Sequence, residues 1–348
     1  MTHLVMDVDT GIDDSLALLY LLGDSRAQLE AIVCTAGNVP ARQVADNTLG
    51  WLALAGAGAI EVALGAEVPL SQPLQTTEDT HGPLGVGYAE LPPHGRTISG
   101  RHAASVWSEA ARSHPGEVTG LVTGPLTNLA LAVQLDPELP QLLGRLVVMG
   151  GALNHPGNTR PTVEWNTAVD PDAAKIVFDR FAGLPAERRP ILCPLDLTER
   201  IVMTSAHVER LAAASGCAAP ERILPSDDRG RRSSADVELI RQLSDAIRFY
   251  MEFHRDMGQG FIAHMHDPFA AAVALDPGRA QYRPATLDVE LAGRLTRGQI
   301  VADWPGPSGA GIWGRPPNAD VAADTDPEAF FDALIERIAA VALDGPAR

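Results

Sequence analysis

The 348-residue chain is long enough to bury a sizeable core, either as one large α/β domain or as two smaller ones. Its 27 basic and 44 acidic residues give a formal net charge of −17, which argues against nucleic acid and acidic membrane surfaces as partners. The sequence shows neither an apolar run that would span a bilayer nor a secretory signal pattern, so we expect a cytoplasmic protein without membrane contact.

An apolar strand is predicted at the start of the chain, and it runs into residues 7–14, DVDTGIDD, before a leucine-rich helix. Four aspartates gather at this junction. Their mutual repulsion requires a cation, protonation or the positive end of the helix, and carboxylate oxygens suit a hard cation such as calcium. We interpret the junction as a metal site. Alternatively, Asp13 caps the helix, Asp14 is a first-turn acid, and Asp7 and Asp9 end a surface strand.

Strands and helices alternate along the following part of the chain. The pattern predicts strands over residues 29–35, 61–64, 117–123, 145–149 and 190–195, and helices over 41–55, 103–113 and 170–181. Such alternation is typical of a parallel sheet with helices on both faces, so we expect one α/β domain over 1–348 with a mostly parallel central sheet. Asp9, Asn38, Thr123 and Met149 follow or end predicted strands, at the edge where open α/β sheets bind ligands.

Irregular segments interrupt this rhythm. Residues 68–93, which contain His81, and the polar residues 217–236 are predicted to be mobile loops near the site, with plain disorder as the alternative for the second. A third irregular segment holds Asn158, Glu164 and Asn166.

A helix over residues 237–257 leads to His266-Asp267-Pro268. Asp267 and Pro268 suit the N-cap and first position of the next helix. The adjacent histidine and the acid cluster elsewhere favour a functional site. A strand over 299–303 and a helix over 327–343 complete the domain. Carboxylates, amides and a histidine in this combination favour a metal-activated water that attacks a polyol-bearing substrate.

The sequence resembles the inosine-uridine nucleoside hydrolases. The likeness is carried by DVDTGIDD (7–14), GN (37–38), VTGPLTN (122–128), VMGG (148–151), EWN (164–166), VDP (169–171) and HDP (266–268), which occur in the order found in the family, with RGQ (297–299) extending it.

This resemblance implies calcium-dependent hydrolysis of the N-glycosidic bond of ribonucleosides to ribose and a free base, on a single-domain α/β fold. It further implies the following roles: Asp9, Asp14 and Asp267 as carboxylate ligands of Ca²⁺ and Thr123 as a carbonyl ligand; Asp9 as general base; His266 as acid for the leaving base; and Asp13, Asn38, His81, Met149, Asn158, Glu164 and Asn166 as substrate-binding residues. With His266 as the acid, the protein is similar to the branch of the family that accepts pyrimidine or mixed nucleosides. Relatives are commonly homodimers or homotetramers.

The sequence departs from the family pattern in places. Thr10 stands where many members have proline, Glu199 stands where histidine is common, and residues 217–236 have no counterpart, which bears on base preference. Two other functions are compatible with part of this pattern. A phosphatase of the haloacid-dehalogenase type would need a lysine partner, for which Lys175 is the single candidate. A calcium-dependent nucleoside or sugar binding protein would require neither Asp9 as a base nor His266 as an acid.

Overall fold

The computed structural model describes residues 1–58, 60–306, 309 and 311–345. Within these residues the chain forms a nine-stranded sheet in the order β10-β9-β11-β6-β5-β4-β1-β2-β3. Of the strand pairs described there, those of β9 with β10 and β11 are antiparallel and the others are parallel. The strands are β1 (Thr2–Val8), β2 (Ala27–Cys34), β3 (Glu61–Leu64), β4 (Val118–Val122), β5 (Arg145–Met149), β6 (Ile191–Cys193), β9 (Gln281–Val289), β10 (Ile300–Asp303) and β11 (Ala319–Asp324).

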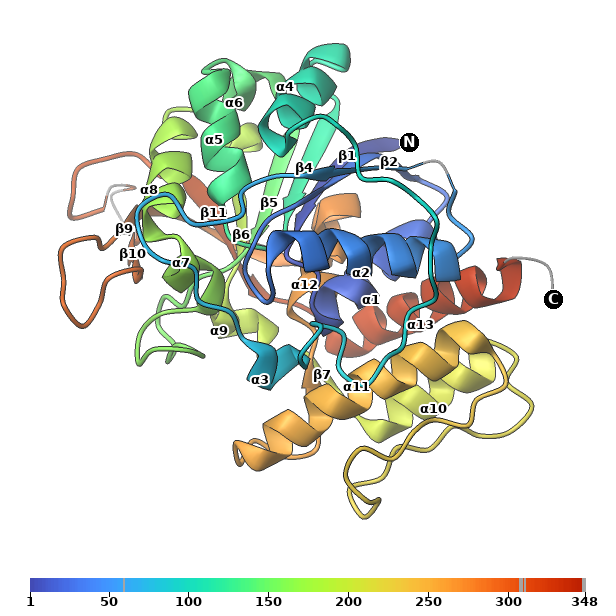
Figure 1. Cartoon of the computed structure of the whole chain (residues 1–348). Helices are drawn as coiled ribbons and strands as arrows, with labels where there is room; N and C mark the ends of the chain where they lie inside the picture. Colours follow the sequence, from blue (N-terminus) through green and yellow to red (C-terminus); the bar gives the residue numbers. More distant parts are fainter. Residues whose placement is uncertain (59, 307–308, 310, 346–348) are drawn as a thin grey trace.

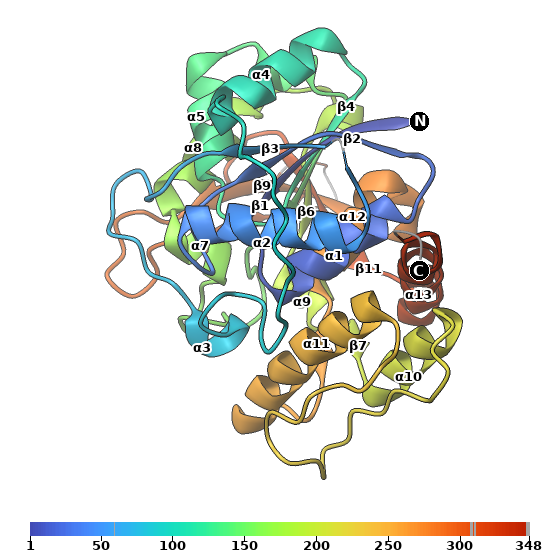
Figure 2. The same ribbon diagram turned by 45° about the vertical axis from the view of Figure 1, so that its right-hand side comes forward.

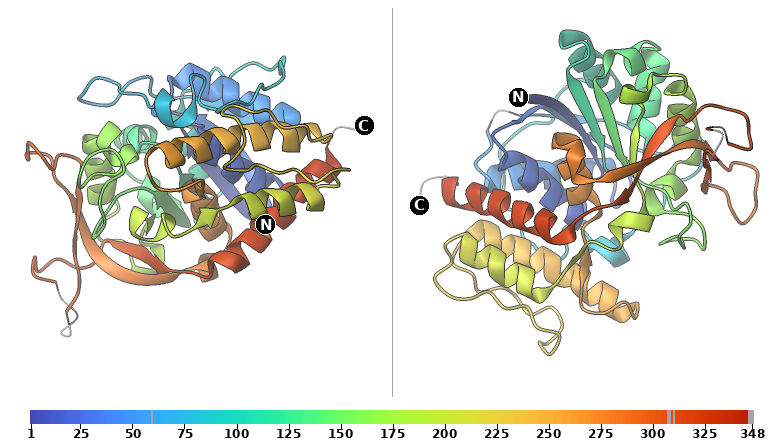
Figure 3. Two further views of the ribbon diagram at one scale, coloured as in Figure 1. Left: turned by 90° about the horizontal axis from the view of Figure 1, so that it is seen from below. Right: turned by 180° about the vertical axis from the view of Figure 1, so that it is seen from behind.

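Helices cover both faces of this sheet (Figure 1). One hydrophobic cluster joins the sheet to α1 (Ile12–Leu22), α2 (Ala41–Leu54), α12 (His266–Leu275) and α13 (Pro327–Asp344). A second cluster joins the opposite face to α4 (Ala103–Ser113), α5 (Thr127–Leu135) and α8 (Pro171–Arg180). Seen from behind, α12 and α13 lie on one side and α5 and α8 on the other (Figure 3). The predicted α/β class with a mostly parallel sheet is confirmed.

A smaller layer lies below the sheet, built from α10 (Ser205–Ala214), α11 (Glu238–Asp256) and a two-stranded antiparallel pair, β7 (Val202–Met203) with β8 (Ala263–His264) (Figure 2). Short helices punctuate the connections: α3 (Glu78–His81), α6 (Leu139–Leu142), α7 (Trp165–Val169), α9 (Leu195–Thr198), and the 3₁₀ turns at Ala186–Arg188 and Pro277–Arg279. Across the described residues, no helix combines the length and apolar character needed to cross a membrane.

Most predicted elements lie within one or two residues of the observed ones, but helix α10 and strands β9 and β11 were not predicted. The reason is visible in their composition. β11 reads ADVAAD, and alanine and aspartate are poor strand formers, while β9 contains Pro284, which normally argues against a strand.

The suggestion that Asp267 caps α12 is wrong. This helix begins at His266, with Met265 as the N-cap residue and no side-chain cap. Asp267 therefore lies inside the first turn, and its carboxylate faces the other acids instead of the backbone of its own helix. The surface-strand alternative for Asp7 and Asp9 is also excluded, because both side chains are buried.

Residues 217–236 contain no helix or strand, and hydrogen bonds join them to α11. Asp227 Oδ2 accepts from Arg248 Nη2 at 2.8 Å, and Asp245 Oδ1 accepts from the Ser233 amide at 2.7 Å. None of these residues lines the cavity described below. Their predicted mobility stays a prediction.

Candidate active site

A cavity of about 650 Å³ opens at the carboxyl ends of the parallel strands β1, β2, β4 and β5. The structure brings almost all of the predicted site residues to its walls. Those that line it are Asp9, Asp13, Asn38, His81, Thr123, Met149, Asn158, Glu164, Asn166, His266 and Asp267. Asp14 lies behind this surface, where its carboxylate accepts from the Gly11 amide at 2.7 Å and from Thr123 Oγ1 at 2.7 Å.

Three carboxylates converge at the cavity, two of them on its surface and that of Asp14 just behind it. Asp13, Asp14 and Asp267 each offer an oxygen atom, and these atoms lie within 4.8 Å of one another. All three side chains are buried. This group contains Asp13, to which the family resemblance gave a substrate role, in addition to the predicted ligands Asp14 and Asp267.

Asp9 lies beside this group and is held by the next loop of the sheet edge. Its Oδ2 accepts from the backbone amide of Asn38 at 2.9 Å. A Cβ atom at Gly37 would come within 2.1 Å of that same oxygen, so the loop can approach Asp9 because residue 37 has no side chain. The GN pair after β2 thus has a structural reason that is independent of any ligand.

Burial sets the protonation of these acids. Burial, reinforced by repulsion between carboxylates, raises the pKa of Asp13 to about 7 and raises the pKa of Asp9 and of Asp267 well above its ordinary value. Among the ion pairs of the described residues, none joins an arginine or lysine to this cluster. Buried oxygen donors without a counter-charge fit a hard divalent cation, which would restore the charged form of the carboxylates.

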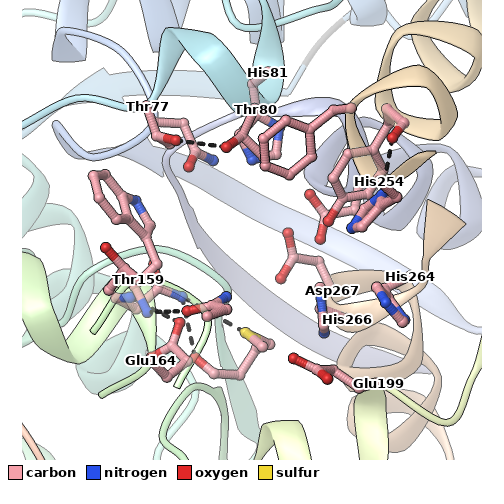
Figure 4. A pocket seen from close by; sticks show the side chains of 18 of the residues that line it. Thr77, Thr80, His81, Thr159, Glu164, Glu199, His254, His264, His266 and Asp267 are labelled. Carbon is pink, nitrogen blue, oxygen red and sulfur yellow. Dashed lines mark hydrogen bonds between the residues drawn. The ribbon is translucent and has the colours of Figure 1, made fainter. Parts of the chain in front are cut away.

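The wall opposite the histidines consists of Glu164 and its neighbours (Figure 4). Glu164 is the N-cap of α7, and its carboxylate accepts from the amides of Gly151 at 2.9 Å and Asn166 at 2.8 Å. Asn166 Nδ2 donates to the Thr123 carbonyl at 2.7 Å. Asn158 is exposed at the rim, and its Oδ1 accepts from the Trp165 amide at 2.9 Å. These contacts fix the polar atoms of this wall before any ligand binds.

Histidines form the other wall. His266 Nδ1 lies 2.7 Å from Thr198 Oγ1, and His264 and His254 follow behind it, with ring centroids 5.4 Å (His266–His264) and 4.8 Å (His264–His254) apart. Burial lowers the pKa of His264 to about 4 and of His254 to about 3, and it lowers the pKa of His266 well below 6.5. These rings are therefore neutral near pH 7.

His81 closes the cavity from α3. Its Nδ1 accepts from the Ile12 amide at 3.1 Å, at the N-terminus of α1, and its ring stacks on Tyr250 with centroids 5.5 Å apart. Burial lowers the pKa of His81 to about 4, so its other nitrogen carries the proton. The predicted loop histidine is thus a buried member of the cavity wall.

Several lining residues were missed as site residues from sequence: His155, Glu199, Tyr250, His254 and His264. A signal existed for Tyr250 and His254, which are four residues apart and so share one face of the helix predicted over 237–257. His264 is two residues before His266, a spacing that places both on one side of an extended segment. His155 carried no comparable pattern, and Glu199 was noted only as a departure from the family pattern.

Lys175 lies away from the cavity, paired with Asp179 at 2.6 Å and Asp288 at 3.1 Å, and it does not line the cavity. The phosphatase alternative therefore lacks the lysine that it needs beside the acids.

The fold and this cavity define an α/β enzyme whose active site lies at the carboxyl edge of a parallel sheet. A family model described as inosine-uridine preferring nucleoside hydrolase matches residues 4–332. The pyrimidine-specific ribonucleoside hydrolase RihA of Salmonella agona (strain SL483) is 32% identical over 336 residues, which cover 96% of this chain and 97% of that protein.

Two solved structures are similar over nearly their whole length. A purine-preferring ribonucleoside hydrolase from Gardnerella vaginalis has a TM-score of 0.84 and 27% identity, covering 98% of this chain and 99% of that chain. An inosine-guanosine nucleoside hydrolase has a TM-score of 0.82 and 26% identity, covering 97% and 98%. The chain belongs to the inosine-uridine preferring nucleoside hydrolase family, and it is an enzyme that hydrolyses the N-glycosidic bond of ribonucleosides.

Proposed function

We propose that this hydrolase uses Ca²⁺ and that it prefers pyrimidine nucleosides or a mixture such as inosine and uridine. The observation that supports this most is the convergence of buried carboxylates at the sheet edge, in a cavity that His266 also lines. The relatives do not agree on the base, since the Salmonella protein is named pyrimidine-specific and the Gardnerella protein purine-preferring. A histidine acid favours the pyrimidine or mixed branch.

Asp9, Asp14 and Asp267 would hold the ion through carboxylate oxygens, together with the Thr123 carbonyl, and Asp13 is close enough to join them. A bound Ca²⁺ would anchor ribose hydroxyls and lower the pKa of a water molecule. Asp9 would accept the proton of that water as general base. Its Oδ2 is held by the Asn38 amide, which fixes the orientation of the carboxylate.

Asp13 and Asn38 would bind the lower hydroxyls of the ribose, with Asn158, Glu164 and Asn166 around its 5′ side and Met149 beneath it. Cleavage passes through an oxocarbenium-like state, and the surrounding carboxylates favour its positive charge. The fixed hydrogen bonds of the Glu164 wall supply the orientation that such a step requires.

His266 would protonate or hydrogen-bond the leaving base, and His81 would line the base pocket. Thr198 Oγ1 lies at one nitrogen of His266, which leaves the other nitrogen free for the substrate. We also propose that the protein is cytoplasmic and that it forms a homodimer or homotetramer. Light scattering of the purified protein measures the number of subunits.

Release of reducing sugar from inosine, uridine, cytidine and adenosine tests the proposal, with and without a calcium chelator. We expect ribose release that the chelator abolishes and that added Ca²⁺ restores. The Asp9→Asn variant, purified in the same way, controls for a contaminating hydrolase. Binding of a nucleoside without any release would favour the alternative of a calcium-dependent binding protein.

A further inference from the structure

Two glutamates line the cavity, and they differ in how their carboxylates are used. The carboxylate of Glu164 is held in place, because it accepts from three backbone amides, those of Gly151, Asn166 and Thr167. Among the described residues, no donor hydrogen-bonds the carboxylate of Glu199. Its ion-pair partner is His155, whose Nε2 lies 3.6 Å from Oε2, beyond hydrogen-bonding distance.

Glu199 is only partly open to solvent, with 21% of its side chain exposed, and it faces the cavity. Figure 4 shows it on the side of His264 and His266, across from Glu164 and Thr159. Its chain neighbour Thr198 contacts His266 Nδ1. Glu199 therefore lies on the side where the leaving base would be, away from the wall assigned to the 5′ side of the ribose.

An acceptor that is largely removed from water and lacks a donor favours a ligand that brings one. An ionised carboxylate can only accept hydrogen bonds, so it attracts an amino group and repels a carbonyl oxygen at the same position. The bases differ in this respect: cytosine carries an exocyclic amino group where uracil carries a carbonyl oxygen, and glutamate and aspartate recognise the cytosine amino group in other settings. No arginine or lysine lines this cavity among the described residues to cancel the charge.

We propose that Glu199 is a specificity-determining residue that selects nucleosides whose base presents an exocyclic amino group, so that it raises the preference for cytidine relative to uridine. This inference rests on the proposed function of the same cavity. Burial raises the pKa of Glu199, while the charge of His155 opposes the shift. Glutamine at this position would have the same shape, but its side-chain amide can donate as well as accept a hydrogen bond. It would therefore pair with the amino group of cytosine or with the carbonyl oxygen of uracil.

The test is a competition assay with cytidine and uridine in one reaction, because the ratio of products then gives the ratio of kcat/KM values regardless of how much enzyme is active. We expect the cytidine-to-uridine ratio to fall about tenfold in Glu199→Gln, as the loss of one charge-assisted hydrogen bond implies. The different leaving abilities of the two bases cancel when variants are compared. Glu199→Asp, with a shorter reach, should give an intermediate ratio and serves if the glutamine variant folds poorly.

The control variant is Glu209→Gln on α10, which removes a carboxylate that pairs with Arg222 outside the cavity. Its ratio should equal that of the wild type. A ratio that is unchanged or higher in both Glu199 variants, with both nucleosides still hydrolysed, overturns this inference and leaves the proposed function intact. Failure of the wild type to hydrolyse either nucleoside, or p-nitrophenyl riboside, removes the proposed function and this inference together.

Discussion

The two ends of helix α1 carry buried aspartates in opposite electrostatic settings. At its start, Asp13 and Asp14 face Asp267, and burial raises the pKa of all three. Just past its end, Asp24 accepts from Arg26 Nε at 2.9 Å and from Arg337 Nε at 2.8 Å. The hydrogen bonds from Arg26, and those from Arg337 with them, lower the pKa of Asp24.

This electrostatic difference distinguishes a ligand-binding site at the start of α1 from a structural ion pair beyond its end. Asp24 joins the end of α1 to α13, and α13 approaches so closely that a Cβ atom at Gly23 would come within 2.0 Å of the Arg337 carbonyl oxygen. Its charge is neutralised inside the fold. The acids at the other end have no such partner in the described chain, so folding leaves repulsion there that a cation can relieve. Function is located where a buried charge is left uncompensated.

The largest expected effect is on catalysis, from Asp14→Asn at the first end of the helix. Removing one carboxylate of the cluster should reduce kcat/KM for uridine by on the order of 1,000-fold, because water activation depends on the ion that the cluster holds. The free energy of unfolding in calcium-free buffer should not fall, since a repulsive charge is removed. Ribose release measures kcat/KM, and urea unfolding measures the free energy of unfolding. If both fell in Asp14→Asn, the acids at the start of α1 would be stabilising the fold, contrary to the contrast drawn between the two ends of the helix.

The same substitution at the other end, Asp24→Asn, should act on stability alone. It leaves Arg26 and Arg337 without their shared carboxylate, which we expect to cost about 3 kcal/mol of unfolding free energy. The kcat/KM value of the folded protein should stay near that of the wild type, because Asp24 does not line the cavity. A loss of catalysis in folded Asp24→Asn protein would show that the two ends of α1 are coupled.

Features formed by residues close together in the sequence could be predicted, whereas contacts between distant segments could not. Asp7 to Asp14 and residues 266–268 are contiguous motifs, and their location on a strand end and a helix start could be inferred from apolar runs and turn residues. Glu199 and His155 are partners that lie 44 positions apart, and Asp24 pairs with Arg337 across almost the whole chain. Such contacts depend on how α9 and α13 pack, which no local pattern records. β9 was missed because Pro284 argues against a strand, and the pairing with β11 that tolerates this proline exists only in the folded chain.

A smaller effect is the response of thermal stability to calcium. A ligand that binds only the folded state at about 100 times its Kd adds roughly 2.7 kcal/mol, which corresponds to about 4 °C in Tm for a chain of this size. We expect this shift in the wild type and in Asp24→Asn, although the latter starts from a lower Tm. In Asp14→Asn the shift should be less than about 2 °C. Differential scanning fluorimetry with calcium and with a chelator distinguishes these patterns, and equal shifts in all three proteins would place the ion elsewhere.

The smallest effect is a dependence of stability on pH that belongs to one end of the helix. Hydrogen bonds from Arg26 lower the pKa of Asp24 below its ordinary value near 3.8, so its stabilisation is present above that value and is lost as the pH falls through the lower, folded-state pKa. The difference in unfolding free energy between wild type and Asp24→Asn should be constant between about pH 5 and 8 and should shrink below about pH 4. Urea unfolding at each pH gives this difference directly, and the contributions of the acids at the cavity cancel because both proteins retain them. If the difference were to persist undiminished at pH 3, the arginines would not be stabilising the ionised form of Asp24, and the electrostatic contrast between the two ends of α1 would fail.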